Sequence, residues 1–308
     1  MKVCADPPYL DTAKCRCLGY AMKHSLPRSA LFMPGSNTRA MEKARTLDCD
    51  AVILDLEDSV APDAKDGARA NVQKALGEGG FGERTVAVRT NGLDTAEITH
   101  DWPIAQQVDA VVVPKISTLD ELGACQAGLW GSRAALWVMI ETPQAILNIR
   151  DLARQASVIA PSLTAFVIGA NDLAKDTGVR QVEGRWNMLP WFSEVVLAAS
   201  AAGLGVLDSV SNNFRALDAF ATECEQGADL GMQGKTLIHP AQIEPCNRAF
   251  APTSADIERA QTIISTFAEP ANTDKGAIQI NGEMVERLHI GGAQEILRRA
   301  KALNLFQG

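Results

Sequence analysis

The sequence lacks the features of several protein classes. Among its 308 residues, no run approaches the roughly 18 consecutive apolar residues of a membrane-spanning helix. The amino-terminal segment has no continuous apolar core of the kind found in a secretory signal peptide, and we expect residues 1–24 to be a disordered leader. Basic residues are outnumbered, with 29 Lys and Arg against 37 Asp and Glu and a net charge of −8. This balance argues against nucleic acid or an anionic membrane as the main partner.

Cysteine and histidine are too scattered to indicate a disulfide framework or a zinc site. The seven cysteines show no CxxC or zinc-ligand spacing, so we interpret them as free thiols and expect a cytoplasmic location. The four histidines are dispersed, which argues against a three-histidine zinc site. There is also no Gly/Ser linker, repeat or low-complexity tract that would suggest a second catalytic domain.

What the chain does contain is a series of apolar runs, each followed by a helical pattern. The runs are SALFMPG (29–35), AVILDLED (51–58), RTVAVRTN (84–91), AVVVPKI (110–116), ALWVMIET (135–142), TAFVIGAND (164–172), LGVLDSV (204–210) and LGMQGKTLIHP (230–240). Continuous Val, Ile and Leu runs are typical of strands buried on both faces of a parallel sheet. About eight strand–helix units predict a (β/α)8 TIM barrel. A doubly wound open sheet is the alternative, but no GxGxxG follows the first run.

We place the catalytic barrel in residues 25–270 and a C-terminal extension in residues 271–308. Helices are predicted over 38–47 and 118–130, where Thr38 and Thr118 are each able to cap, and over 254–268. The extension contains a weakly extended stretch over 272–284 and a final helix over 292–303. We expect this appendix to pack on a neighbouring subunit.

One stretch, VMIETPQAILN (138–148), places an acid at the end of an apolar run. Glu141 follows ALWVMI, and Pro143 suits the first turn of a helix but cannot donate to a sheet ladder. The strand should therefore end near Glu141, at the edge of a parallel barrel where ligands and metals bind. A Glu that only caps the following helix is the alternative.

Polar residues follow the other runs at the corresponding position. In a barrel they would share one face, and they are Pro34, Gly35, Asp55, Glu57, Asp58, Arg89, Asn91, Lys115, Glu141, Asn171, Asp172, Asp208, Lys235 and His239. A cluster of acids around one Arg at the mouth of an apolar barrel is costly to assemble without a function. The placement therefore predicts an active site.

The residue types favour metal-assisted chemistry. Glu141 and Asp172 are candidate ligands of one divalent cation, since two carboxylates with waters and substrate oxygens is a usual Mg²⁺ arrangement. Arg89 suits an enolate or carboxylate oxygen. The turn Gly169-Ala170-Asn171 can present backbone N–H groups to a substrate carboxylate at a helix start.

A Schiff-base aldolase is the rival reading within the same fold. Lys115 or Lys235 would be the nucleophile and would need a pKa lowered by burial. Because neighbouring carboxylates keep a lysine charged, this reading ranks below the metal-dependent one.

A family resemblance is carried by seven motifs in order along the chain. LFMPGSNTRAMEKA, VILDLEDSVAPDAKDGAR, VAVRTNGLDT, VVPKI, VMIETPQAILN, GANDLAKDTG and GKTLIHPAQI resemble the citrate lyase β-subunit-like proteins of the HpcH/HpaI aldolase superfamily, with the malyl-CoA and citramalyl-CoA lyases. The resemblance implies a lyase dependent on Mg²⁺, or on Mn²⁺, that cleaves a 3-hydroxyacyl-CoA thioester in retro-Claisen fashion. The products would be acetyl-CoA and a 2-oxoacid, or the reverse condensation would run. It also implies a homo-oligomer, a trimer or hexamer.

The resemblance also assigns roles to residues. It makes Glu141 and Asp172 the metal ligands, and Arg89 the residue that holds substrate and stabilises the acetyl enolate. Asp55 and Glu57 would orient Arg89 and metal-bound water. The residues that would contact coenzyme A are Phe32, Arg39, Lys43, Lys65, Ile238 and His239.

The chain departs from the pattern in its C-terminal extension. The CoA lyases carry an Asp in a Gly-x-Met-x-Asp run that reaches the neighbouring subunit's site, whereas here Glu286 ends the run that starts at Gly282. Glu286 is the candidate proton relay, with its carboxylate displaced by roughly 1 Å or more. The departure leaves two other readings open: a citrate lyase subunit acting on an acyl carrier protein thioester, and a non-catalytic thioester-binding relative.

Overall fold

Eight parallel strands close into a barrel in the computed structural model, which describes residues 26–305. The strands are β1 (Ser29–Pro34), β2 (Ala51–Asp55), β3 (Thr85–Arg89), β4 (Ala110–Val113), β5 (Ala135–Ile140), β6 (Leu163–Ile168), β7 (Gly205–Asp208) and β8 (Gly234–Leu237). Each strand pairs in parallel with the next, and β8 closes the barrel on β1 through pairs such as Ala30 with Thr236. The TIM-barrel prediction is confirmed, and the open-sheet alternative is wrong. The expected leader, residues 1–24, lies outside the described residues.

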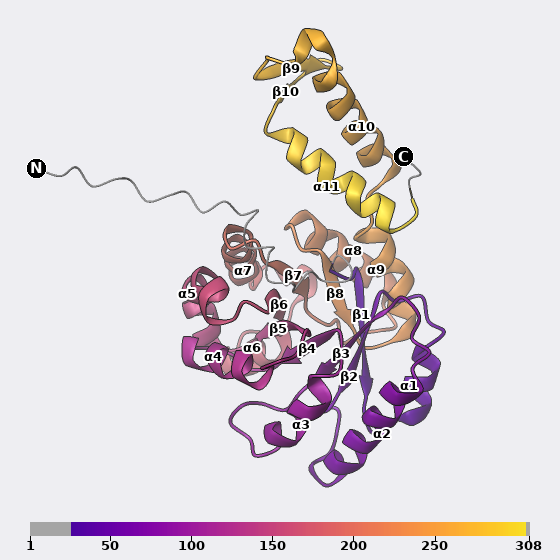
Figure 1. Cartoon of the computed structure of the whole chain (residues 1–308), viewed down its shortest axis with the longest axis vertical. Coiled ribbons are helices and arrows are strands. Elements are labelled where there is room, and N and C mark those ends of the chain that lie inside the picture. The colour runs from indigo at the N-terminus through magenta and orange to yellow at the C-terminus, as the bar shows by residue number, and fades with distance from the viewer. Residues whose placement is uncertain (1–25, 306–308) are drawn as a thin grey trace, which may run out of the picture. The chain divides into compact units, whose positions relative to one another are not determined.

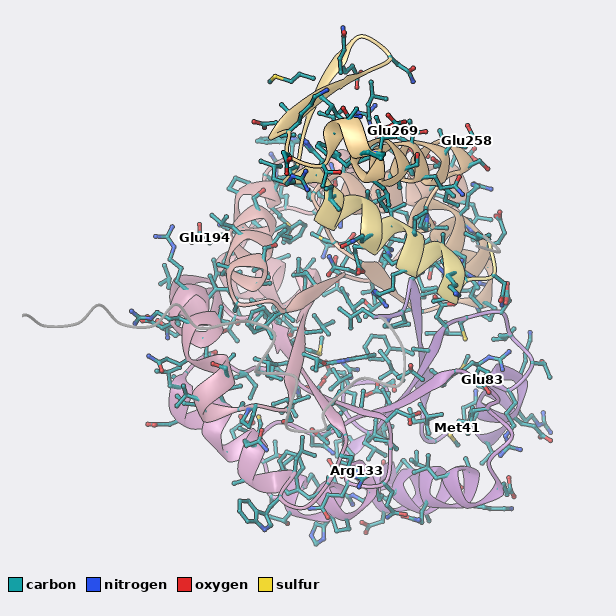
Figure 2. All side chains as sticks on the ribbon, turned by 45° about the horizontal axis from the view of Figure 1, so that its top comes forward. Met41, Glu83, Arg133, Glu194, Glu258 and Glu269 are labelled. Carbon is teal, nitrogen blue, oxygen red and sulfur yellow. The ribbon has the colours of Figure 1, made fainter. Side chains whose placement is uncertain are left out.

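Helices connect the strands and cover the outside of the barrel (Figure 1). They are α1 (Thr38–Ala44), α2 (Lys65–Glu78), α3 (Ile98–Ala105), α4 (Leu119–Gly128), α5 (Pro143–Ile159), α6 (Ala170–Thr177), α7 (Leu189–Ala201), α8 (Leu217–Asp229) and α9 (Ile243–Ala249), with short 3₁₀ turns η2 (Pro62–Ala64), η3 (Glu183–Arg185) and η4 (Pro240–Gln242). Figure 2 shows Glu194 at the outer surface of α7, where it pairs with Arg150 of α5.

Two predicted helix caps have different outcomes. Thr118 caps α4 in a capping box with Glu121, as expected. The cap expected at Thr38 is wrong by one residue, because the side chain of Asn37 accepts the N–H of Ala40 and α1 begins after it. Asn is at least as good an N-cap as Thr, so the two adjacent residues compete for the position.

Alternate residues of each strand point into the barrel and fill it with apolar side chains. The inner cluster consists of Ala30, Ala51, Ile53, Ala87, Ala110, Val112, Ala135, Trp137, Met139, Ala165, Val167 and Leu207. Trp137 of β5 is fully buried there, and the many alanines on the other strands leave room for its indole ring. The interior is therefore a packed core, and the polar residues are left to the ends of the strands.

Residues 247–305 belong to a second compact unit. It contains α10 (Ser254–Ala268), η5 (Pro270–Asn272), the antiparallel hairpin of β9 (Ala277–Ile280) and β10 (Glu283–Glu286), and α11 (His289–Ala302). The unit begins before the expected boundary at 271, because Ile263 and Phe267 of α10 pack with Ile278 and Val285 of the hairpin in one apolar cluster. No helix within residues 26–305 is long and apolar enough to span a membrane.

Candidate active site

The carboxyl ends of consecutive strands place the predicted charged residues around one mouth of the barrel. Asp55 ends β2 and Arg89 ends β3, and the two residues are paired in register. Glu141 directly follows β5, and Asp172 lies in the first turn of α6, just after β6. Because the strands are parallel, all of these positions belong to the same face, as the sequence predicted.

Arg89 is held on three sides. Its Nε and Nη2 donate to the two carboxylate oxygens of Asp55, both at 2.7 Å. Its Nη1 lies 2.9 Å from Glu57 Oε2, an ion-pair contact whose geometry is not that of a hydrogen bond. The ring of Phe32 lies 4.7 Å from the guanidinium carbon. A guanidinium has five N–H groups, so this arrangement fixes its plane and leaves N–H groups available to a substrate oxygen.

Asp55 and Glu57 are themselves tied to the loop that follows β2. Asp55 accepts the N–H of Glu57 at 2.9 Å and the hydroxyl of Ser59. Glu57 also accepts the ammonium group of Lys115 at 2.6 Å. Asp55 and Glu57 therefore lie where they orient Arg89, and the additional partner Lys115 links them to β4.

Glu141 does not cap the helix that follows it. The side chain of Thr142 accepts the N–H of Ala145 at the start of α5, with Pro143 in the first turn. Glu141 instead points into the site, where Oε1 accepts the backbone N–H of Lys115 at 2.9 Å. Only 1% of Glu141 is exposed. The helix-capping alternative is therefore wrong.

The electrostatics around Glu141 favour the binding of a cation. Burial, followed by the negative charges of Glu57 and Asp172, raises the pKa of Glu141 to about 8. Besides Glu141, the charged side chains that interact at this mouth are Asp55, Glu57, Asp58, Asp172, Arg89 and Lys115. Carboxylates therefore outnumber cations here, and a bound cation would reduce the repulsion among them.

The donor set fits Mg²⁺. Glu141 and Asp172 offer hard carboxylate oxygens, which this ion prefers, and it usually keeps further places for water and substrate. No group of three or more His, Cys, Asp or Glu side chains in a metal-binding arrangement occurs within residues 26–305. The described residues thus resemble a two-carboxylate Mg²⁺ site and not a closed zinc site.

Gly169 gives Glu141 the space that it occupies. A Cβ on Gly169 would lie 2.5 Å from Glu141 Oε2 and would collide with Glu141 Cβ. The N–H of Gly169 bonds to Ile140 O at 3.1 Å, so it is not available to a substrate. The first intrahelical bond of α6 runs from Leu173 N–H to Gly169 O, which leaves the N–H groups of the preceding turn directed out of the helix start.

The ionisation states of the surrounding groups follow from their pairing. Burial alone would raise the pKa of Asp55, but the charge and hydrogen bonds of Arg89 outweigh it and the pKa is lowered. Burial raises the pKa of Glu57 despite Arg89 and Lys115. Burial lowers the pKa of Lys115, but its hydrogen bond to Glu57 reverses the effect, and the pKa is raised. Lys115 is therefore a cation and not a neutral amine.

The structure gives Lys235, Asp208 and Lys115 other roles than the sequence suggested. Lys235 is fully buried and pairs with Asp208 at 2.8 Å. Leu207 belongs to the barrel's inner cluster, so its neighbour Asp208 and the paired Lys235 face the helix layer. Arg185 of η3, which the sequence analysis missed, also binds Asp208, at 2.8 Å. A Schiff base at Lys235 is excluded by this burial, and one at Lys115 is disfavoured by its charge.

The residues expected to contact coenzyme A are distributed over four places in the barrel unit: Phe32 in β1, two residues in α1, one at the start of α2 and two after β8. Arg39 and Lys43 are exposed and lie one turn apart on α1. The ammonium group of Lys65 donates to the carbonyls of residues 56 and 57 at 2.7 and 2.8 Å, so it supports the loop after β2. After β8, Ile238 is 41% exposed, and His239 stacks on Phe214, with ring centroids 4.5 Å apart.

Several supporting residues were missed because they come from loops. The loop residues Gln181 and Asn212 hydrogen-bond through their side-chain amides to Asn171, a predicted site residue in the first turn of α6. Asn and Gln in loops carry no distinctive spacing, so this cluster leaves no pattern in the sequence. Glu286 is exposed at the end of β10 in the second unit, and its backbone N–H donates to His289 Nδ1 at 2.9 Å.

A cavity of about 370 Å³ adjoins the charged side chains Glu57 and Lys115 at the mouth of the barrel. It is lined by residues of the loops after β2, β3 and β4, among them Glu57, Lys65, Asn91 and Lys115. The class of protein that this fold and site define is a (β/α)8 barrel with a candidate two-carboxylate metal site and an arginine fixed at its mouth.

The chain belongs to the HpcH/HpaI aldolase/citrate lyase family, which matches residues 28–240. It is 41% identical to a (3S)-malyl-CoA thioesterase of Cereibacter sphaeroides, over 91% of this chain and 96% of the relative. It is 30% identical to the L-malyl-CoA/beta-methylmalyl-CoA lyase of Rhodobacter capsulatus, over 90% and 95%. Among solved structures, CitE of Mycobacterium tuberculosis in complex with magnesium, acetoacetate and coenzyme A superposes with a TM-score of 0.71, at 25% identity over 89% of this chain and 97% of CitE.

Proposed function

We propose that this protein is a Mg²⁺-dependent enzyme that acts on coenzyme A thioesters of 3-hydroxy dicarboxylic acids of the malyl type. The observation that carries the proposal is the pairing of the Glu141 and Asp172 carboxylates with a fixed Arg89 at one barrel mouth. When bound, Mg²⁺ would chelate the substrate's carboxylate and hydroxyl oxygens and act as a Lewis acid. The magnesium and coenzyme A in the CitE complex support this assignment.

We propose that the main reaction is hydrolysis of the thioester. Water adds to the thioester carbonyl carbon, the C–S bond breaks, and the products are malate and free coenzyme A. Relatives called malyl-CoA thioesterases are about 40% identical to this chain over nearly their whole length, well above the 30% of the lyase. The Glu286 departure supports the same ranking, since the proton relay of the lyases is altered here.

Cleavage of the C–C bond to acetyl-CoA and a 2-oxoacid is the second candidate. The family and the Rhodobacter capsulatus lyase favour it. In both reactions negative charge develops on the thioester carbonyl oxygen: a tetrahedral oxyanion in hydrolysis, an enolate in retro-Claisen cleavage. Arg89, whose position is fixed by Asp55 and Glu57, would stabilise that oxygen in either case.

The remaining groups would bind the substrate and move a proton. Arg39 and Lys43, exposed on α1, would contact the coenzyme A phosphates as the resemblance implies. Phe32 packs on Arg89 and would exclude water from one side of it. We propose that Glu286 of a neighbouring copy in a trimer or hexamer is the proton-transferring carboxylate.

The test is a product assay with purified protein, Mg²⁺ and malyl-CoA. Free thiol is measured with a disulfide reagent, and 2-oxoacid is measured as its phenylhydrazone. Thiol release without 2-oxoacid supports hydrolysis, and 2-oxoacid without thiol assigns the second reaction. Turnover of free coenzyme A esters by the purified protein contradicts the alternative in which the chain is a citrate lyase subunit that acts on an acyl carrier protein thioester. Absence of Mg²⁺-dependent turnover across a panel of 3-hydroxyacyl-CoA esters contradicts the proposed function and favours a non-catalytic thioester-binding relative.

A further inference from the structure

We propose that Lys115 is a positioning residue that joins the two halves of this site with two separate groups. Its backbone N–H holds the metal-binding carboxylate of Glu141, and its ammonium group, through Glu57, holds Arg89. The inference rests on the proposed function, because it assigns Glu141 to the metal and Arg89 to the substrate oxygen. No pattern in the sequence indicates this role for Lys115.

The backbone of Lys115 has a conformation that matches the first role. Its φ is 57°, in the left-handed region that lysine rarely adopts. At this turn after β4, the N–H is directed to Glu141 Oε1 on the neighbouring strand end, at 2.9 Å. An unfavourable backbone conformation is kept only where surrounding contacts require it, and the contact here is the hydrogen bond from the Lys115 N–H to Glu141.

The side chain of Lys115 makes the second connection. Its Nζ lies 2.6 Å from Glu57 Oε1, and the other oxygen of Glu57 lies 2.9 Å from Arg89 Nη1. Glu57 is 5% exposed, so a carboxylate there depends on both cations for compensation. Loss of the ammonium group would leave the Glu57 side chain with Arg89 as its cation and would change the positions of Glu57 and Arg89.

The ammonium group can also be replaced from outside. The side chain of Lys115 is 40% exposed and borders the cavity that includes Lys65 and Asn91. A small alkylamine can therefore enter the space that a truncated side chain leaves. This provides a measurement that a purely structural role of Lys115 would not affect.

The experiment compares Lys115→Ala, Lys115→Gly and Lys115→Arg in the full-length protein, with Lys74→Ala as a control. Lys74 is an exposed lysine of α2, so its loss changes the net charge equally. In the Ala and Gly variants we expect kcat to fall about 10- to 100-fold. Their Mg²⁺ dissociation constant, measured by titration calorimetry with the metal alone, should stay within about threefold of the wild type, since the N–H remains.

Two further readouts separate the roles of the side chain and the backbone. Ethylammonium should restore the rate of the Ala variant in a saturable manner without stimulating the wild type, and the Arg variant should retain more activity than the Ala variant. The Gly variant should unfold at a higher temperature than the Ala variant, because glycine adopts a positive φ without steric cost.

The proposal is overturned if Lys115→Ala keeps the wild-type kcat, or if Mg²⁺ affinity falls in parallel with kcat. It is also overturned if neither ethylammonium nor Lys115→Arg recovers activity. If the wild type itself turns over no thioester, the proposed function fails. In that case the role of Lys115 is tested by Mg²⁺ affinity and unfolding temperature alone. Its backbone role is supported if the Ala and Gly variants keep the wild-type Mg²⁺ affinity and the Gly variant unfolds at a higher temperature than the Ala variant. Any other result rejects that role.

Discussion

Replacing Gly169 by Ala should displace the metal-binding carboxylate without disturbing the fold. The added Cβ would lie 2.5 Å from Glu141 Oε2, whereas ordinary contacts of a Cβ begin near 3.4 Å. Glu141 must therefore shift by about 0.9 Å, and its own Cβ is crowded as well. The backbone of Gly169 is not the obstacle, since its φ of −108° is open to alanine. A misplacement of about 1 Å at a reacting centre can cost roughly 100-fold.

We therefore expect Gly169→Ala to weaken Mg²⁺ binding and to lower kcat/KM about 100-fold. Mg²⁺ affinity would be measured by titration calorimetry and turnover by thiol release. The matched control is Gly67→Ala in α2, where a Cβ meets nothing within 4 Å and alanine favours the helix by up to about 1 kcal/mol. Wild-type Mg²⁺ affinity in Gly169→Ala would refute the steric argument. A loss of secondary structure in the same variant would show that the glycine supports the fold instead.

Three further predictions concern charged groups. Glu141→Ala and Asp172→Ala should each bring Mg²⁺ binding below calorimetric detection with an unchanged circular dichroism spectrum; binding by either variant contradicts its assignment as a ligand. Arg89→Lys should lower kcat about 10²- to 10³-fold in steady-state assays, because two hydrogen bonds to one carboxylate are lost, and a wild-type kcat would remove Arg89 from the mechanism. Asp208→Ala should destabilise the fold by about 3–5 kcal/mol in urea unfolding, since Lys235 is left buried without its partner at 2.8 Å. In the folded protein burial would raise the pKa of Asp208, but Lys235 outweighs burial and the pKa is lowered. The stabilisation that Asp208 provides is therefore present above the unfolded pKa of about 3.9 and is lost as the pH falls from there through the lower folded pKa. Asp208→Asn should flatten this acid dependence of the free energy of unfolding.

The strands and the mouth of the barrel could be predicted because they depend on local patterns. Apolar runs such as residues 51–55 and 135–140 are buried on both faces, so each is continuous in sequence and ends at a polar residue. Once the strands are parallel, the residues that follow them must meet at one end, which brings Asp55, Arg89 and Glu141 together. The sequence also indicated a helix beginning near Pro143, but left open whether Glu141 capped it; the structure shows that Thr142 does.

Contacts between loops could not be predicted. The sequence placed Lys235 and Lys115 together at strand ends, yet Lys235 is the second residue of β8 and faces the helix layer, whereas Lys115 follows β4 and faces the mouth. A shift of one residue along a strand reverses the face, and run boundaries read from sequence are uncertain by more than that. Arg185 reaches Asp208 from a turn with a positive φ, a conformation that no pattern in the sequence indicates.

The two candidate reactions differ in the fate of a proton and not in the groups that hold the substrate. In hydrolysis a base must take a proton from water, and in retro-Claisen cleavage a base takes the hydroxyl proton and an acid protonates the enolate carbon. Within the mouth, Asp55 and Glu57 are paired with Arg89, and Lys115 is paired with Glu57, so these groups stabilise charge and are poorly suited to exchange protons. We propose that the choice between C–S and C–C cleavage depends on Glu286, a carboxylate outside this cluster. Substitution of Glu286 should accordingly change the ratio of thiol to 2-oxoacid, whereas Arg89→Lys should slow the formation of both products equally.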